Sequence, residues 1–476
     1  MNIGSKTKIV ATLGPATCEN EVLKKMILSG LDVFRLNFSH GEYSEKEKCI
    51  SMIRELENEL SVNVAIIVDL QGPKIRIGKV ENEPVLLNDD DIINFSSSED
   101  NNSNNTYYIS YQNFANDVKV GEFILIDDGK LKLEILSIDL FNQFVSAKVV
   151  HGGFLYSNKG VNLPNTETSL PSLTEKDKND VLFALNHDID FIALSFVRKA
   201  EDISELREYI HKFKKDIKII AKIEKPDAVV NIDKIIDVSD GVMVARGDLG
   251  VEMDFDKVPV IQKQIVSKCI QKACPVIIAT QMMESMIEQF RPTRAEANDV
   301  ANSVNDGADA LMLSGETSVG KYPVETIQAM QSIINYTEEN RKIYYKSYCS
   351  NPSSNSFLQE ALCNNACTLA QQTGAKAIIT FTNSGYTARE ISSHRPKANI
   401  FAFTANLEIL KKISLFWGVT AFNFPLFDSI DKAIDFSIDI LLKEEFVKKG
   451  DIVIHVASTP LWSKDKTNML KITQIK

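Results

Sequence analysis

Short apolar runs rich in β-branched residues alternate along the chain with amphipathic stretches of helical length. Most neighbouring runs are separated by about one crossover helix, and near-continuous apolar strands between helices are typical of a parallel sheet covered by helices. Eight such units predict a (β/α)8 barrel of the TIM type. The eight predicted strands are residues 6–13, 31–38, 64–70, 191–197, 217–224, 241–247, 275–280 and 310–314.

Two regions depart from this repeat. The segment between the third and fourth predicted strands is too long for one helix and contains alternating strands at 121–129, 130–138 and 143–153. Strands at 377–382, 399–404, 419–424 and 451–458 alternate with helices and predict an open α/β sheet. We therefore expect a TIM barrel with an inserted small β-barrel lid domain and a C-terminal open α/β domain. The expected limits are 1–71 and 171–340 for the two barrel parts, 72–170 for the lid and 341–476 for the C-terminal domain.

Composition narrows the class of protein. The net charge of −11 argues against a nucleic-acid partner, whose basic footprint would be visible. The first residues, MNIGSKTKIV, lack the apolar region of a signal peptide, and no apolar run approaches the ~20 residues of a membrane span. The seven cysteines are scattered and form no C-x-x-C pair. We therefore expect a cytoplasmic protein with reduced thiols.

Polar side chains follow the predicted barrel strands at their carboxyl ends, which is the functional face of this fold. Glu224 and Asp248, from neighbouring strands, present two carboxylates to one hard cation such as Mg²⁺ or Mn²⁺. Lys222 lies two residues before Glu224 and so points to the same side of its strand. A lysine, arginines and a divalent ion suit phosphoryl transfer, which depends on positioning and charge neutralisation. The alternative is a structural ion-pair network across the barrel mouth.

The chain resembles the pyruvate kinase family at these same residues and along nearly its full length. The order of the matching segments, with a β insert after DLQGPKIR, makes coincidence a poor explanation. The segments are TKIVATLGPA (7–16), RLNFSHG (35–41), DLQGPKIR (69–76), KGVNLP (159–164), LSFVR (194–198), ARGDLGVE (245–252), ATQMMESM (279–286), PTRAE (292–296) and GETSVGKYP (315–323).

The resemblance implies transfer of a phosphoryl group from phosphoenolpyruvate to ADP, giving pyruvate and ATP. It implies that Lys222 stabilises the moving phosphoryl group and that Arg35 contacts it. Glu224 and Asp248 would hold the divalent ion. The remaining implied substrate contacts are Gly247 and Asp248 through their backbone amides, and Thr280 through a water that protonates the enolate.

The resemblance also implies a nucleotide site between the barrel and the lid. Asn37, His40, Arg76 and Lys159 would lie against ADP or ATP, and closure of the lid would exclude water. A homotetramer is implied by the same resemblance.

One departure from the family pattern concerns a monovalent cation. Many members hold K⁺ with side chains that match Asn37, Ser39 and Asp69, near a glutamate where this chain has Lys74. Leu70 and Gln71 also replace the usual Thr-Lys pair. A tethered ammonium supplies a positive charge without a free ion, so we expect K⁺ not to be required. The alternative is plain surface variation at Lys74.

The C-terminal domain carries a possible effector site. Thr382, Asn383, Ser384, Gly385 and Thr387 follow a predicted strand and precede a helix, which makes a natural phosphate cradle. A simple capping turn is the alternative. Related enzymes bind a sugar-phosphate activator in the matching loop, and the effector here is expected to be a sugar phosphate or a nucleotide.

Two other functions remain open at this point. One is another barrel enzyme acting on phosphoenolpyruvate or a pyruvate enolate, which would need no nucleotide lid. The other is a non-catalytic regulatory paralogue, which the intact set Lys222, Glu224, Asp248 and Thr280 disfavours.

Overall fold

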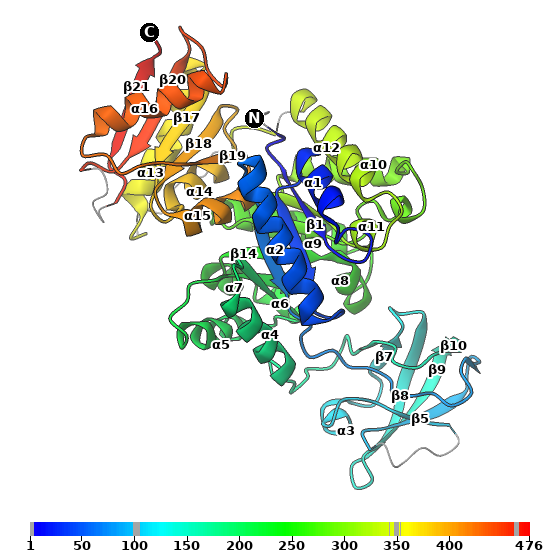
Figure 1. Cartoon of the computed structure of the whole chain (residues 1–476). Coiled ribbons are helices and arrows are strands. Elements are labelled where there is room, and N and C mark those ends of the chain that lie inside the picture. Colours follow the sequence, from blue (N-terminus) through cyan, green and yellow to red (C-terminus); the bar gives the residue numbers. More distant parts are fainter. Residues whose placement is uncertain (1–3, 99–104, 342, 347–351, 353, 461–465) are drawn as a thin grey trace.

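The chain folds into a central barrel with one further unit on each of two opposite sides (Figure 1). The computed structural model describes residues 4–98, 105–341, 343–346, 352, 354–460 and 466–476. The inserted β-rich segment and the C-terminal α/β segment both contact the barrel and not each other in this view (Figure 1). The expected fold class is confirmed, whereas the expected domain limits stay predictions.

The barrel is a closed sheet of parallel strands in the order β1-β16-β15-β14-β13-β12-β3-β2. Each strand falls within a run predicted from the sequence, because runs of buried and mostly apolar residues fit a strand covered on both faces. The inward layer includes Val10, Val33, Phe191 and Met243. The strands are β1 (Lys8–Thr12), β2 (Val33–Asn37), β3 (Ala65–Asp69), β12 (Phe191–Leu194), β13 (Lys218–Ile223), β14 (Gly241–Ala245), β15 (Val276–Ala279) and β16 (Ala310–Leu313).

Helices surround the barrel and pack their apolar faces on the strands. Helix α10 shows the local signals well, since Thr293 and Glu296 form a capping box at its start and Gly307, with φ +97°, ends it. The helices are α1 (Asn20–Leu28), α2 (Tyr43–Leu60), α4 (Glu175–Asn186), α5 (Ala200–His211), α6 (Pro226–Val230), α7 (Ile232–Val238), α8 (Arg246–Glu252), α9 (Val258–Gln271), η2 (Glu284–Ile287), α10 (Arg294–Asp306), α11 (Gly315–Ser318) and α12 (Pro323–Asn340).

The insert is a half-barrel with its own core. A mixed sheet in the order β11-β7-β8-β9-β5-β6 lies beside a small β10-β4 sheet. Along β8, Leu131, Leu133 and Ile135 are buried at alternate positions, as one covered face requires. The elements are β4 (Val85–Leu87), β5 (Ile92–Ser96), β6 (Thr106–Tyr108), α3 (Phe114–Asp117), β7 (Phe123–Ile126), β8 (Leu131–Asp139), β9 (Phe144–His151), β10 (Gly153–Leu155) and β11 (Val161–Asn162).

Two chain segments join the insert to the barrel, and each is held by hydrogen bonds. On the outgoing segment, Ser195 donates to the Leu70 carbonyl at 2.7 Å and the Gly72 amide donates to Asp177 Oδ1 at 3.0 Å. On the returning segment, the Arg198 guanidinium donates to the carbonyls of Thr168 and Leu170 at 2.6 and 2.7 Å. Both tethers are therefore fixed where they leave the barrel.

The C-terminal unit is a doubly wound sheet in the order β19-β18-β17-β20-β21. Separate apolar clusters cover its two faces. The sequence did not predict the antiparallel edge strand β21. The elements are α13 (Phe357–Thr373), β17 (Ala377–Phe381), α14 (Tyr386–Ser393), β18 (Asn399–Thr404), α15 (Leu407–Lys412), η3 (Ile413–Leu415), β19 (Val419–Asn423), α16 (Ile430–Lys443), β20 (Ile452–Ala457) and β21 (Met469–Gln474).

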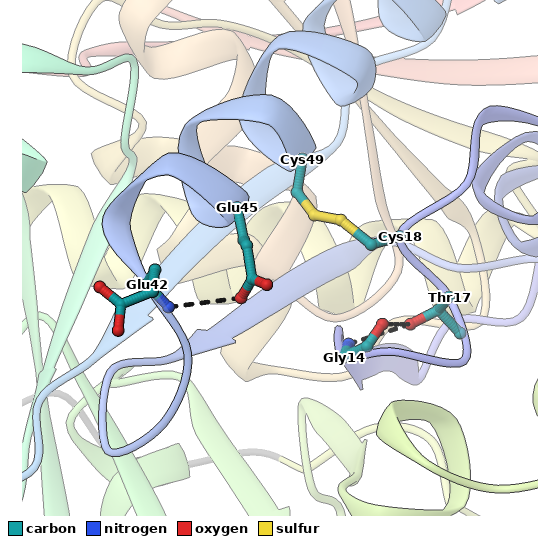
Figure 2. Close-up of a disulfide and its surroundings, with 6 residues drawn as sticks. All are labelled: Gly14, Thr17, Cys18, Glu42, Glu45 and Cys49. Carbon is teal, nitrogen blue, oxygen red and sulfur yellow. Dashed lines mark hydrogen bonds between the residues drawn. A yellow bond between two sulfur atoms is a disulfide. The ribbon is translucent and has the colours of Figure 1, made fainter.

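One pair of cysteines corrects the expectation of reduced thiols. Cys18 and Cys49 form a disulfide with their Cα atoms 5.8 Å apart, joining the segment after β1 to helix α2 (Figure 2). Their separation of 31 residues gives no sequence signal, because only the packing of α2 brings them within bridging distance. Four described cysteines, Cys269, Cys274, Cys363 and Cys367, are free and buried.

None of the helices in the described ranges combines the length and the apolar character that a membrane span requires.

Candidate active site

Lys222 is the centre of the charged cluster at the carboxyl ends of the barrel strands. Its Nζ atom lies 2.6 Å from Ser195 Oγ, 3.0 Å from Asp69 Oδ1 and 2.9 Å from Glu224 Oε1. Burial alone would lower the pKa of Lys222, but the carboxylates of Asp69 and Glu224 outweigh burial and raise that pKa above its ordinary value. Lys222 is therefore a fixed cation at neutral pH and cannot serve as a general base.

Arg35 is held beside Lys222 by a shared partner. Its Nε atom lies 2.7 Å from Asp69 Oδ2, and its Nη1 atom donates to Thr12 Oγ1 at 2.9 Å. Burial would raise the pKa of Asp69, but Lys222 and Arg35 together hold it below the ordinary value. One buried carboxylate thus positions two cations side by side, each from a different strand.

Glu224 and Asp248, the residues expected to hold a divalent ion, interact electrostatically across neighbouring strand ends. Burial and the charge of Asp248 raise the pKa of Glu224, although Lys222 lowers it. A divalent cation between these carboxylates would relieve their repulsion, and their oxygens are ligands that Mg²⁺ and Mn²⁺ prefer. Among the described residues no group of three His, Cys, Asp or Glu side chains is arranged to hold a metal ion. The donor set therefore fits an ion whose remaining ligands are water and substrate.

Thr280 and Gly247 face each other over the sixth and seventh strand ends. The Gly247 amide donates to Thr280 Oγ1 at 2.7 Å, and that hydroxyl donates to the Ala279 carbonyl at 2.6 Å. Thr280 has φ +70° and Gln281 has φ +54°, a left-handed pair that is strained for a β-branched residue. A substrate carboxylate that takes the Gly247 amide must therefore displace the Thr280 hydroxyl, which would free it for water.

The predicted nucleotide residues come from two units: Asn37 and His40 from the barrel, and Arg76 and Lys159 from the insert. Burial and the positive charges of Arg76, Lys74, Lys46 and Lys176 lower the pKa of His40, which places His40 within a basic region. Arg76 donates to the Asn158 carbonyl at 2.9 Å. These cations suit nucleotide phosphates.

Other predicted nucleotide residues have different surroundings. Lys159 pairs with Asp127 at 2.9 Å within the insert, and Asn37 Oδ1 accepts from the Ser39 amide at 3.0 Å. Lys159 is thus already paired, and Asn37 shapes its own loop.

The residues of the predicted monovalent-cation region do not all lie together in the structure. Asp69 already contacts Lys222 and Arg35, Leu70 is buried, and Ser39 takes part in the turn with Asn37. Lys74 does not contact Asp69. Its stem packs on Gly160, and it has no ion-pair partner in the described part of the chain. The structure therefore does not bring Lys74 together with the rest of this region.

The predicted effector residues form a turn between β17 and α14. Thr382 Oγ1 accepts from the Gly385 amide at 3.0 Å, and Gly385 has φ +81°, which its lack of a side chain permits. Thr387 hydroxyl bonds to Thr467 at 2.8 Å, whereas Asn383 and Ser384 are exposed. Residues 461–465, between β20 and β21, lie outside the described residues.

The sequence missed two groups in the cluster. Ser195 and Thr12 lie near the ends of the predicted strands 191–197 and 6–13, but neither was assigned a partner from the sequence. The signal for both was their position at the last residues of barrel strands, which faces the mouth. Asp69 was assigned to the monovalent ion and not to Lys222 and Arg35.

Comparisons with known proteins agree with this geometry. Family models for the pyruvate kinase barrel domain and the pyruvate kinase alpha/beta domain match residues 4–327 and 360–473. A pyruvate kinase of Geobacillus stearothermophilus is 41% identical over 471 residues, covering 98% of this chain and 80% of the relative. A pyruvate kinase of Clostridium acetobutylicum is 40% identical over 471 residues, covering 98% of this chain and 99% of the relative.

A solved structure resembles the whole chain. The crystal structure of a pyruvate kinase from Cryptosporidium parvum superposes with a TM-score of 0.92 at 34% identity, covering 99% of this chain and 96% of that one. Barrel, insert and charged mouth together define a phosphotransferase. The chain belongs to the pyruvate kinase family.

Proposed function

We propose that this protein transfers the phosphoryl group of phosphoenolpyruvate to ADP, the last step of glycolysis. The observation that carries the proposal is Lys222, held as a cation between Asp69 and Glu224 at the barrel mouth. A fixed positive charge stabilises the charge that develops on the moving phosphoryl group and on the enolate oxygen.

Each neighbouring residue has a role that follows from its contacts. Arg35, fixed by Asp69 and Thr12, contacts the phosphoryl oxygens. The backbone amides of Gly247 and Asp248 bind the substrate carboxylate. Thr280, once released from Gly247, positions the water that protonates the enolate.

Glu224 and Asp248 would hold the divalent ion. When bound, that ion neutralises charge on substrate and phosphoryl oxygens. Without it, the repulsion between these two carboxylates is compensated only in part by Lys222.

The nucleotide binds between barrel and insert. His40 lies among Arg76, Lys74 and other cations, and Arg76 is anchored to the insert through Asn158. With Lys159 and Asn37, these residues accept the phosphates of ADP, and closure of the insert excludes water from the transfer.

The enzyme does not require K⁺. Asp69, the carboxylate that would attract a monovalent cation, is already paired with Arg35 and Lys222. Lys74 adds a further positive charge near the cleft it lines with Asp248. We expect full activity in K⁺-free buffer, because Arg35 and Lys222 already supply positive charge to Asp69. Wild-type enzyme that stays inactive until K⁺ is added would contradict this.

Regulation and assembly complete the proposal. A phosphorylated metabolite, either a sugar phosphate or a nucleotide, binds at the 382–387 turn, where Asn383 and Ser384 are exposed. The enzyme works in the cytoplasm as a homotetramer.

Pyruvate formation from phosphoenolpyruvate, measured with and without ADP and Mg²⁺, tests the proposed reaction. ADP-dependent pyruvate supports the proposal. Pyruvate or another product formed without ADP would favour a different barrel enzyme, and ligand binding without turnover would favour a regulatory paralogue.

A further inference from the structure

Glu252 lies at the point where the insert meets the barrel, and none of the roles above uses it. It is the last residue of helix α8, and its side chain is buried. Its Oε1 atom accepts from Asn162 Nδ2 at 2.7 Å and pairs with Lys225 Nζ at 2.5 Å. Asn162 belongs to strand β11 of the insert, and Lys225 follows Glu224 directly. One carboxylate oxygen therefore joins three parts of the molecule.

The position is unfavourable for a negative charge. The carbonyl end of a helix repels carboxylates, and burial raises the cost. The second oxygen of Glu252, Oε2, is buried and has no hydrogen-bond partner in the described structure. A buried acceptor without a partner is destabilising, by about 1–3 kcal/mol in other proteins. Plain helix packing would favour an apolar residue here, so the carboxylate points to a specific use.

The surroundings indicate what that use is. Glu252 lies one helical turn after Asp248, on the same side of α8, and both line a cleft between barrel and insert. Asn162 and Lys74 line the same cleft. Figure 1 shows α8 on the side of the barrel that faces the insert. Gly129 of the insert also lies near Val251 of α8.

We propose that Glu252 is a positioning residue that docks the insert onto the catalytic helix through Asn162, with Lys225 holding its charge in place. The contact sets the orientation of the insert relative to Asp248. It thereby fixes the width of the cleft between barrel and insert, where the nucleotide is proposed to bind. The proposal rests on the proposed function for its kinetic readout but not for its structural one.

The test is an exchange of the two side chains. Asn162→Asp is nearly isosteric, removes the donor and places a second carboxylate against Glu252. Asn162→Asp with Glu252→Gln restores one amide and one carboxylate in swapped positions, and the carboxylate stays within reach of Lys225. Asn142→Ala is the matched control, because Asn142 is an exposed residue of the same insert whose side chain bonds only to Asp139.

Hydrogen–deuterium exchange of β11 and β7 and the separate KM values for ADP and phosphoenolpyruvate are the readouts. In Asn162→Asp we expect faster exchange in β11 and a rise in the KM for ADP of about tenfold, the ratio that ~1.4 kcal/mol produces. The KM for phosphoenolpyruvate, which binds on barrel residues, changes by less than about twofold. The double variant recovers most of both effects, and Asn142→Ala matches wild type.

Three outcomes would overturn the docking role. Asn162→Asp could behave like Asn142→Ala in exchange and in KM. The double variant could add to the defect in place of relieving it. Both KM values could rise together with a general loss of stability. If the preparation shows no ADP-dependent turnover at all, the proposed function fails, and the exchange measurements still decide the docking role.

Discussion

Lys222 and His455 are both buried titratable groups, but their pKa values are shifted in opposite directions. Lys222 lies at the barrel mouth with two carboxylates within 3.0 Å, and its pKa is raised. His455 lies on β20 of the C-terminal unit, between β17 and β21, where neither ring nitrogen has a hydrogen-bond partner in the described structure. Burial and the charge of Lys471 lower its pKa to about 4.

The difference teaches that partners, and not burial, decide the charge of a buried group. Burial disfavours the charged form in both places. At the mouth, the anions Asp69 and Glu224 come from strand ends that hold them rigidly, so the charge is kept. In the C-terminal sheet the cross-strand neighbours of His455 are the apolar Ile379 and the cation Lys471, so the ring stays neutral. The first environment is suited to electrostatic catalysis and the second only to packing.

The largest expected effect is the loss of catalytic rate when the charge of Lys222 is removed. Lys222→Met should lower kcat by about 10³-fold, since removal of one preorganised electrostatic group costs ~10²–10³ in rate. Steady-state pyruvate formation measures the loss. Lys257→Met, which removes an exposed lysine paired with Asp254, serves as the control. A Lys222→Met enzyme within tenfold of wild type would remove Lys222 from the mechanism.

A smaller effect is expected for the neutral group, His455, and it concerns the pH dependence of stability. The pKa of His455 is about 4 in the folded protein and has its ordinary value of 6.5 in the unfolded chain. Between these two pH values the unfolded chain binds a proton at His455 and the folded chain does not. The free energy of unfolding is therefore unaffected by this group above pH 6.5 and decreases as the pH falls from 6.5 toward 4, by up to about 3 kcal/mol.

The measurement is urea unfolding of wild type and His455→Leu at pH 7.5, 6 and 5. The difference between the two proteins should shift in favour of the leucine variant as the pH falls. A difference that does not vary with pH would mean that His455 gains a partner when charged.

The smallest effect concerns the 382–387 turn, which has no buried charge of its own. Ser384→Asp places an anion at an exposed position beside the proposed phosphate cradle. We expect basal kcat within about twofold of wild type and the activation constant of a phosphorylated effector raised about tenfold, the ratio of ~1.4 kcal/mol. Activation assays with sugar phosphates and AMP measure this. If the response to each of them is unchanged in Ser384→Asp, the effector site lies elsewhere.

The barrel was predictable from the sequence because its strands are buried on both faces and read as continuous apolar runs. Strand β13, with Ile219, Ile220 and Ala221 all buried, is an example. Strands with one exposed face gave a weaker signal. β21 (Met469–Gln474) has no buried residue at the sheet edge, and β11 has only two residues, so neither was predicted.

The site was predictable as a set of positions but not as a set of contacts. Arg35, Lys222, Glu224 and Asp248 all end or follow barrel strands, which gave their common location. Register and side-chain rotamers decide which atoms meet. The pairing of Asp69 with both Arg35 and Lys222, the Gly247–Thr280 hydrogen bond and the disulfide of Cys18 therefore needed the fold.

The two anchored tethers of the insert limit how it can move. A body held by a single flexible chain can tilt and spin in any direction, whereas one held at two fixed points can only swing about the line that joins them. Ser195 and Asp177 fix the first point, and Arg198 fixes the second. Two anchored segments thus favour rotation of the insert about the axis that joins them. The closing movement proposed above would then bring the same face of the insert to the barrel mouth each time.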